Sequence, residues 1–232
     1  TPSLFAWEYT TENVSLMPAL VNTVVMTGLS LLIAVPLGIF AAIYLVEYAK
    51  RGNRLVSIVR ITAETLTGIP SIVFGLFGML FFVTALQWGM SLMAGICTLV
   101  IMVLPLIMRT SEEALKAVPD SYREASFGLG AGKLRTIFTI VLPSAVPGIL
   151  AGIILAIGRI IGETAALLYT SGTVAQVPNL MGSGRTLALH MYVLSSEGLH
   201  MNQASATAVV ILAFVLVINF LSGAVAKRIA KG

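Results

Sequence analysis

The sequence predicts an all-α fold, a polytopic bundle of membrane-spanning helices, and three observations lead to it. Hydrophobic residues make up 57% of the 232 residues and charged residues only 10%, with a mean hydropathy of +0.97. Apolar stretches of ~20 residues, long enough to cross ~30 Å of hydrocarbon, recur along the chain. Basic residues gather between these stretches. A soluble domain needs a more charged surface, so we expect lipid to cover most of this chain.

Five predicted spans make up one transmembrane domain, residues 1–232. Pro36 and Pro70 lie in two of them as expected kinks, which bundles tolerate because neighbouring helices satisfy the freed carbonyls. The expected spans are 19–46, 68–86, 90–108, 145–169 and 204–226, with a cytoplasmic loop at 109–142 and an outer loop at 171–203.

Lysine and arginine residues predict the orientation of the bundle. They follow the first, third and fifth spans, whereas the opposite side carries only Arg185. By the positive-inside rule the chain starts outside and ends in the cytoplasm. His190 and His200 then fall in the outer loop without metal-site spacing, and we expect both to be ordinary loop residues. The basic residues on the cytoplasmic side are Lys50, Arg51, Arg54, Arg109, Lys116, Arg123, Lys133, Arg135, Lys227, Arg228 and Lys231.

The stretch FGLGAGKL, residues 127–134, has the glycines and lysine of a phosphate-binding loop but not its ends. A Walker A loop begins with Gly and ends with Ser or Thr after the lysine, whereas Phe127 and Leu134 occupy these places. The flanking pattern is also helical, without the β-strand that precedes such a loop. We therefore expect no ATP site in this chain, and no metal cluster or covalent nucleophile. Nucleic-acid binding is not expected either, because no basic face is interleaved with aromatic residues.

The same region predicts two helices joined by a flexible elbow. Pro119 ends the preceding helix, and Ser121 with Glu124 has the spacing of a capping box for a new helix. The glycines interrupt this short helix, and a second one begins at about Lys133. An apolar stripe on a helix too short to be stable alone favours docking into a groove on another protein. The alternative is a helix that lies on lipid headgroups.

The run EASFGLGAGKLRTIFTIVLP is similar to the signature loop of importer permeases of the ATP-binding-cassette class. Ser126 is the one departure, in place of the second alanine of E-A-A. The resemblance implies a type I importer permease core in which this loop is the coupling helix that docks on a separate ATPase subunit. ATP and Mg would then bind to that partner, and this chain would carry no cofactor. The matching residues are Glu124, Ala125, Gly130, Ile140, Leu142 and Pro143.

A charged pair lies inside the fourth predicted span. Arg159 comes ~16 residues after Pro143, roughly 24 Å along a helix, and a charge at that depth costs at least ~2.5 kcal/mol. We expect it to face a cavity or a partner. Glu163, four residues on, can meet Arg159 on one helical face. Small residues on the same face, which let another helix approach closely, are Gly148, Gly152 and Ala156.

The candidate translocation residues are Arg159, Glu163, Thr164 and Arg109. The planar guanidinium of Arg159 suits an oxyanion, whose oxygens match its paired donors, and Glu163 would orient the arginine or weaken its hold on the anion. Thr164 follows in the same segment, and Arg109 would receive an anion leaving the route. The alternatives are that Arg159 and Glu163 only neutralise each other and that Arg109 only anchors the chain at the cytoplasmic surface.

Three further segments, PLGIFAAIYLVEYA, IPSIVFGLFG and GRIIGETAALLYT, resemble the A-type permease subunits of bacterial phosphate-specific importers (PstA type). The resemblance implies phosphate as substrate in the inner membrane. It implies as partners a second permease subunit (PstC type), an ATPase dimer (PstB type) and a periplasmic phosphate-binding protein (PstS type). Members of this family normally carry one further N-terminal span, and because the sequence opens with TPSLF rather than Met we expect such a span upstream.

Three alternative functions stay open on the sequence. The first is a gradient-driven secondary transporter or channel with Glu163 as its ion site, the second a permease for another oxyanion such as molybdate or sulfate, and the third a structural subunit whose partner carries the route.

Overall fold

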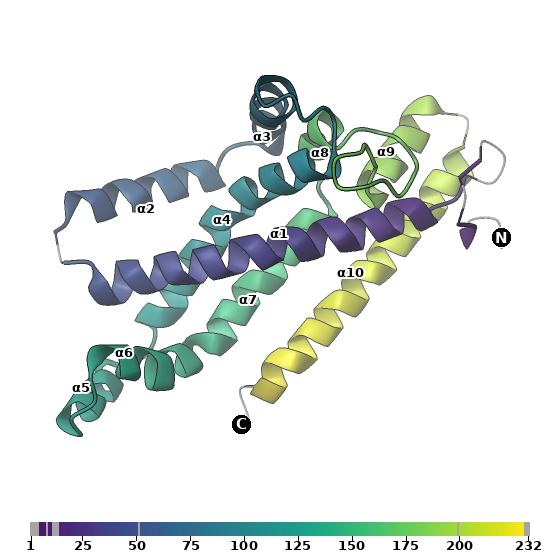
Figure 1. Cartoon of the computed structure of the whole chain (residues 1–232). Helices are drawn as coiled ribbons and strands as arrows, with labels where there is room; N and C mark the ends of the chain where they lie inside the picture. The colour runs from purple at the N-terminus through teal and green to yellow at the C-terminus, as the bar shows by residue number, and fades with distance from the viewer. Residues whose placement is uncertain (1–4, 8, 11–13, 51, 199, 230–232) are drawn as a thin grey trace. The chain divides into compact units, whose positions relative to one another are not determined.

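A computed structural model describes the chain except residues 1–4, 8, 11–13, 51, 199 and 230–232, and the described part is helical, without a β-strand (Figure 1). The π-helical segments η2, η3 and η4 continue α1, α3 and α6 without a break. In chain order the elements are α1 (Met17–Ile43), η2 (Tyr44–Tyr48), α2 (Arg54–Thr67), α3 (Ser71–Gly78), η3 (Met79–Ala85), α4 (Leu92–Lys116), α5 (Asp120–Gly128), α6 (Lys133–Thr136), η4 (Ile137–Val141), α7 (Leu142–Ile161), α8 (Ala165–Thr170), α9 (Leu187–Glu197) and α10 (Met201–Ile229).

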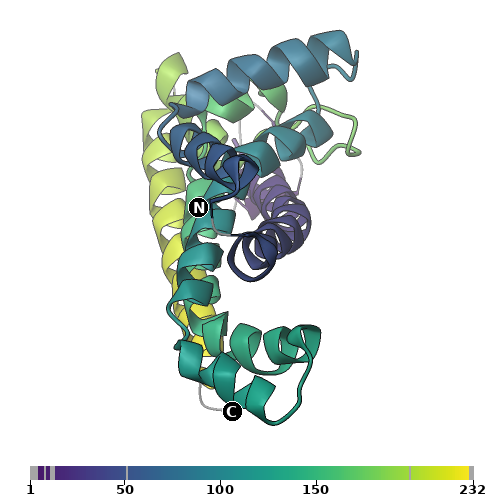
Figure 2. The same ribbon diagram turned by 90° about the vertical axis from the view of Figure 1, so that its left-hand side faces the viewer.

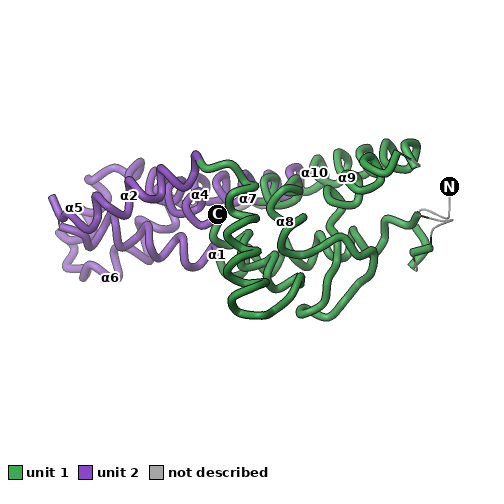
Figure 3. The backbone as a smooth tube through the Cα atoms, turned by 90° about the horizontal axis from the view of Figure 1, so that it is seen from above, with its two compact units in different colours: residues 1–33, 69–102, 157–218 green, residues 34–68, 103–156, 219–232 purple. Residues whose placement is uncertain are grey.

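The chain divides into two compact units, which are coloured separately in Figure 3. Helices α1, α4, α7 and α10 each contribute residues to both. Unit 1 contains residues 1–33, 69–102 and 157–218, and unit 2 contains residues 34–68, 103–156 and 219–232.

Four helices of the described chain are long and apolar enough to cross a membrane, and a fifth span is formed if a bent pair counts as one. The pair consists of α2 and the continuous helix of α3 and η3, which meet at 103°. Pro70 is the N-cap residue of α3 and has an extended backbone, so the expected kink at this proline is a sharp bend. The expected span 68–86 is thus only the second half of the bent pair. The four long helices are Met17–Tyr48, Leu92–Lys116, Lys133–Ile161 and Met201–Ala224.

The helix at the fourth expected span begins and ends earlier than 145–169. It starts at Lys133 and runs through η4 into α7, and Pro143 follows the π-helical segment η4 almost directly, so the missing N–H of the proline falls where the regular hydrogen-bond pattern is already interrupted. It stops at Ile161, and a turn over residues 162–164 separates it from α8. Irregular backbone at membrane depth occurs where protein or a water-filled cavity surrounds it.

Close contacts of glycines in unit 1 hold α8 in place beside α3 and α4. A Cβ on Gly75 would lie 2.8 Å from Cα of Ala166, and one on Gly95 would meet Leu167 and Ser171. These glycines let the backbones approach closely, as small residues do between membrane helices. The turn before α8 is therefore held by packing on two sides.

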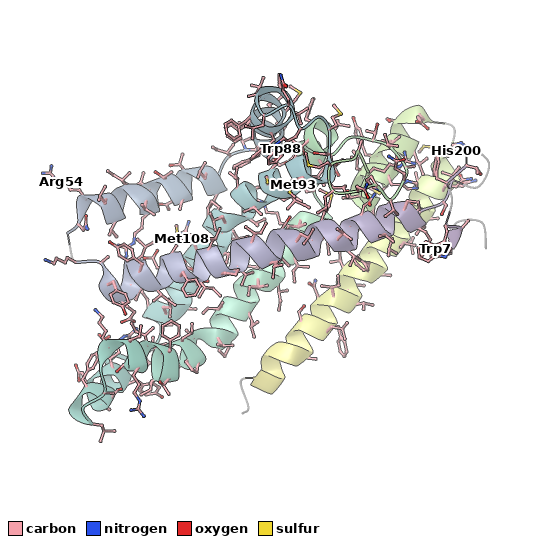
Figure 4. The ribbon with its side chains drawn as sticks, in the orientation of Figure 1. Trp7, Arg54, Trp88, Met93, Met108 and His200 are labelled. Atoms are coloured by element: carbon pink, nitrogen blue, oxygen red, sulfur yellow. The ribbon has the colours of Figure 1, made fainter. Side chains whose placement is uncertain are left out.

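Unit 2 has a core in which α4 packs against α7 and the end of α1. Buried Ile43, Leu115, Val141 and Ile149 belong to one cluster. A second cluster joins η2 and α2 to α4, with Met108 pointing into it (Figure 4). These contacts fix the segment that leads into α5.

Gly148 and Gly152 of α7 face α4, as the small-residue pattern predicted. A Cβ on Gly148 would lie 2.7 Å from Cβ of Ala114, and one on Gly152 would overlap the side chain of Thr110. The absence of side chains at these two positions allows the helices to touch.

We expect Gly152→Ala to lower the stability of the chain by about 1–3 kcal/mol, because the added methyl group overpacks the contact with Thr110. Thermal unfolding in detergent measures the loss. Gly158→Ala in the same helix is the matched control, since a Cβ there meets nothing within 4 Å and alanine has the higher helix propensity. Equal melting temperatures for the two variants would contradict the close contact.

Large apolar side chains are exposed along α1 and α10, including Leu32, Phe40, Leu216 and Phe220. Such a surface is unfavourable in water and matches the lipid-covered surface that the composition predicted. Of the basic residues used for the orientation, Arg51 and Lys231 lie outside the described residues, as do the side chains of Lys227 and Arg228.

Candidate functional site

The elbow in unit 2 consists of α5, a glycine turn and α6, and Figure 2 shows it in teal, where the chain folds back on itself. Gly130 has φ +82°, a left-handed conformation that only glycine adopts at no steric cost. The helix–elbow–helix prediction is confirmed, including the start of α6 at Lys133. The capping-box prediction is wrong, because α5 begins at Asp120 after Pro119, and no side chain caps it.

Ser126 links α5 to α6 by a side-chain hydrogen bond. Its side chain is buried, and its hydroxyl forms a 2.8 Å hydrogen bond with that of Thr136, which also donates to the carbonyl of Gly132. The alanine that Ser126 replaces has no hydroxyl for this bond. The single departure from the signature loop is therefore a structural link in this chain.

Arg123 holds α5 against the end of α4 and was missed as a site residue. Its Nε and Nη2 donate to Oε1 of Glu47 at 3.0 and 2.8 Å, while Nη1 and Nη2 donate to the carbonyls of Val118 and Leu115 at 2.8 and 3.0 Å. The two charged side chains are only 14% and 9% exposed. Glu47, a lone acid in the run YLVEYA, was the signal in the sequence that could have identified this partner.

A groove of about 590 Å³ lies on the elbow, lined by Tyr122, Leu129 and Arg135 together with the signature-loop residues Ala125, Gly130 and Ile140. Leu129 is 89% exposed, and Glu124 on α5 is exposed as well. Leu142 and Pro143 begin α7. Exposed apolar surface next to a groove is a feature of protein interaction sites.

Arg159 and Glu163 do not form the expected pair. Because α7 ends at Ile161, the two residues are no longer on one helix, and Glu163 turns to α8. Its Oε1 accepts a hydrogen bond from the N–H of Ala166 at 3.0 Å, and the side chain is buried. A carboxylate in this position satisfies an otherwise free amide of the first turn and is favoured by the helix dipole.

Arg159 lies in the last turn of α7 and is partly buried. Within the described part of the chain it makes no hydrogen bond and no ion pair. Thr164 precedes α8 as its N-cap residue but makes no capping bond with its side chain. In unit 1 the structure therefore places Arg159, Glu163 and Thr164 around one turn and leaves the guanidinium without a protein acceptor.

Arg109 belongs to unit 2 and is already paired. Its Nε donates to Glu113 at 3.2 Å, and its Nη1 lies 3.7 Å from Glu64. Nearby, the buried carboxylate of Glu112 binds Arg60 at 2.7 Å and Lys116 at 2.6 Å. Together these ion pairs link α2 to α4.

His190 is not the loop residue that the sequence suggested. It lies on α9 and is 1% exposed, with its ring edge-on to Tyr9. Burial, together with the positive charge of Arg185, lowers the pKa of His190 to about 3, so that the imidazole is neutral at pH 7. His200, in contrast, lies between α9 and α10, as expected (Figure 4).

We expect stability to fall as the pH is lowered from about 6.5 to about 3, since unfolded His190 binds a proton that the folded chain excludes. Above this window His190 is neutral in both states and adds no pH dependence. Within this window the free energy of unfolding falls by up to about 1.4 kcal/mol per pH unit because of this one group. Thermal unfolding of the wild type and of His190→Gln at matched pH values isolates this contribution, because acidic residues titrate equally in both. Parallel pH curves would contradict the assignment.

Comparison with known proteins identifies the family of this chain. Residues 34–231 match the family described as binding-protein-dependent transport system inner membrane component. A probable ABC transporter permease protein, YqgI of Bacillus subtilis, is 34% identical over 78% of this chain and 66% of its own length. The phosphate transport system permease protein PstA 1 of Mycobacterium tuberculosis is 44% identical over 66% of this chain and 50% of its own. The chain thus spans half to two thirds of the length of these curated relatives.

Solved structures show the same fold at low sequence identity. An inward-facing structure of the MetNI methionine ABC transporter superposes with a TM-score of 0.69 over 91% of this chain and 93% of that chain, at 20% identity. A bacterial alginate ABC transporter in complex with its periplasmic protein gives 0.74 over 99% and 82%, at 19% identity. The fold is that of type I ABC importer permeases, as predicted. The chain belongs to the family of binding-protein-dependent transport system inner membrane components.

Proposed function

We propose that this chain is the permease subunit of an ATP-driven importer of inorganic phosphate. Two PstA relatives, from Mycobacterium tuberculosis and Yersinia pestis, are 44% and 45% identical over two thirds of this chain, and both are named for phosphate transport. The observation that carries the proposal is the exposed elbow with its groove, which has the residues of the signature loop at the required positions.

ATP hydrolysis in a partner subunit moves this chain through the elbow. A partner ATPase binds ATP and Mg, and its surface receives Leu129 and the groove on α5. Because Ser126 bonds to Thr136 and Arg123 to Glu47, a displacement of α5 is passed to α6 and to the ends of α1 and α4. The chain itself binds no cofactor and catalyses no reaction.

Transport then proceeds by alternating access, with Arg159 as the anion-binding group of the route. A guanidinium with no protein acceptor can offer its paired donors to phosphate. Glu163 keeps the turn after α7 in shape through its bond to Ala166. Because Oε1 of Glu163 already accepts this bond, the residue is less available as an ion site, which disfavours a gradient-driven transporter. Arg109 stands at the cytoplasmic end of the route, held by Glu64 and Glu113.

The assembly contains a second permease subunit of PstC type, a PstB-type ATPase dimer and a PstS-type periplasmic phosphate-binding protein. It lies in the bacterial inner membrane, with the start of this chain outside and its C-terminus in the cytoplasm. The bilayer covers the apolar faces of α1 and α10, and nucleic acid has no role.

Reconstitution with and without the partner subunits tests the class and the substrate. We expect uptake of radiolabelled phosphate into vesicles only when the ATPase, ATP and the binding protein are present. Transport by the permease subunits alone would identify a gradient-driven carrier or channel. Preferred uptake of sulfate or molybdate would keep the class and change the substrate.

We expect Glu124→Lys to separate ATP hydrolysis from uptake, because a reversed charge on the exposed face of α5 weakens docking without disturbing the buried contacts of the elbow. The ratio of phosphate imported to ATP hydrolysed should fall at least about tenfold, as a loss of ~1.4 kcal/mol implies. The matched control is Arg54→Met, which changes an exposed charge at the start of α2 (Figure 4). An unchanged ratio in Glu124→Lys would reject docking at this face.

A further inference from the structure

Arg185, in the segment between α8 and α9 of unit 1, is a buried cation that has no counter-charge among the described residues. It is 4% exposed, and its Nε and Nη2 have no hydrogen-bond acceptor within the described chain. Its guanidinium lies 4.8 Å from the ring centre of Tyr9, a contact that compensates only a small part of the cost of removing a charge from water.

The polar groups next to Arg185 in sequence are unsatisfied as well. The Thr186 hydroxyl is buried, has no partner among the described residues and does not cap α9. Neither ring nitrogen of His190 has a partner in the part of the chain that the structure describes, and the neutral imidazole supplies one N–H. Asn22 donates its amide to the Arg185 carbonyl at 3.1 Å and to that of Gln176 at 2.8 Å, and so fixes the segment against α1.

The unsatisfied groups of this cluster are mostly donors, and one of them carries a full positive charge. Nε and Nη2 form the side of a guanidinium that binds two oxygens of one oxyanion at once. Buried polar groups are almost always hydrogen-bonded, and a lone buried charge costs several kcal/mol. A small anion removes both deficits together.

A hollow of about 600 Å³ lies on the other side of Tyr9, a residue that also contacts Arg185 and His190. Trp7, Val21 and Gln176 line it, as does Tyr9. One face of the Tyr9 ring contacts the Arg185 guanidinium. Rotation of Tyr9 would open the hollow toward Arg185. Because the Nε and Nη2 atoms lie beneath the surface of this chain's own fold, a free anion reaches them more readily than a carboxylate fixed on another protein.

We propose that Arg185, Thr186 and His190 form an anion site on the outer side of the permease, which takes one tetrahedral oxyanion and, in the proposed function, inorganic phosphate. This site is separate in sequence from the turn that carries Arg159. The choice of phosphate rests on the proposed function, whereas the site itself rests on a buried guanidinium that has no acceptor among the described residues.

The test is phosphate binding by the complete transporter in nanodiscs without its binding protein. We expect the wild type to bind one more phosphate per copy of this chain than Arg185→Met, by equilibrium dialysis with radiolabelled phosphate. Phosphate should also raise the melting temperature of the wild type more than that of the variant. Without phosphate, Arg185→Met should melt at the higher temperature, since the unpaired buried charge is gone. Arg54→Met is the control and should behave as the wild type.

Equal stoichiometry and equal phosphate-dependent melting shifts in the wild type and Arg185→Met would overturn the site, and hydration alone would then explain the cluster. Loss of subunit assembly in the variant, with no phosphate response in the wild type, would also overturn it in favour of a carboxylate on a partner. If Arg185→Met fails to fold, Arg185→Lys keeps the charge without the paired donors, and its phosphate affinity should be at least about tenfold weaker. Unchanged affinity in that variant rejects the site.

Parallel measurements with sulfate, molybdate and chloride at equal ionic strength separate this inference from the proposed function. A response to sulfate or molybdate but not to phosphate would support the Arg185 site and reject phosphate as the cargo. Normal phosphate uptake without any anion response at Arg185 would reject the site and leave the proposed function intact.

Discussion

Replacing Arg159 by alanine is expected to reduce ATP-driven phosphate uptake at least about 30-fold, as a loss of about 2 kcal/mol of charge-assisted binding implies. The reason is that Arg159 has no acceptor among the described residues, so its donors are free for the cargo. Uptake into vesicles, with subunit assembly checked by copurification, measures the effect. Stability should change little, because the residue loses only the interaction with the end of α7, about 0.3–1 kcal/mol.

Two variants distinguish a role of this turn in transport from a role in stability. Arg159→Lys keeps the charge and should retain part of the uptake, since it loses the paired geometry. Glu163→Ala should instead lower stability by about 1 kcal/mol, because the first turn of α8 loses its capping acceptor. Normal uptake by Arg159→Ala would rule out direct anion binding. A large loss of stability in that variant would favour the alternative in which Arg159 only balances Glu163.

Arg123→Ala is expected to loosen the elbow and uncouple transport, at a cost of about 3–5 kcal/mol to the local structure. The change leaves the carboxylate of Glu47 buried without its partner and removes the donor from the carbonyls of Leu115 and Val118. Faster amide hydrogen exchange in residues 120–141 would report the loosening, and the ratio of phosphate moved to ATP hydrolysed would report the coupling.

The double variant Arg123→Met with Glu47→Gln controls for the buried carboxylate that Arg123→Ala leaves without a partner. Because it removes both charges together, it should recover a substantial part of the stability that Arg123→Ala loses. Equal hydrogen exchange in the wild type and Arg123→Ala would show that α5 is held by other contacts. Coupling that survives a loosened elbow would reject the proposed transmission through this pair.

The elbow was the most predictable part of the molecule. Its glycines, its short apolar helix and the restart at Lys133 are local features, and local backbone preferences decide them. The long apolar helices were predictable for the same reason, since the requirement to bury backbone polar groups in lipid leaves a helix as the solution within one chain segment.

The break at Gly162 and its consequences were not predictable from spacing. A run of apolar residues around GRIIGETAALLYT reads as one continuous helix, and a four-residue spacing then pairs Arg159 with Glu163. In the folded chain α8 is held beside Gly75 and Gly95, and Glu163 finds a closer partner in the amide of Ala166. The bond between Arg123 and Glu47 likewise joins residues 76 positions apart.

The sequence by itself determined that this chain is a bundle of membrane helices with a signature loop, because hydrophobicity, glycine placement and motif spacing act over short distances along the chain. Only the tertiary structure decided which charges are paired. Glu47 pairs with Arg123, Glu163 accepts a hydrogen bond from α8, and Arg185 is buried beside Tyr9 with no counter-charge among the residues that the structure describes. The physical reason is that the environment of a charge depends on atoms brought together from distant segments, and its energy changes by several kcal/mol with burial and partners.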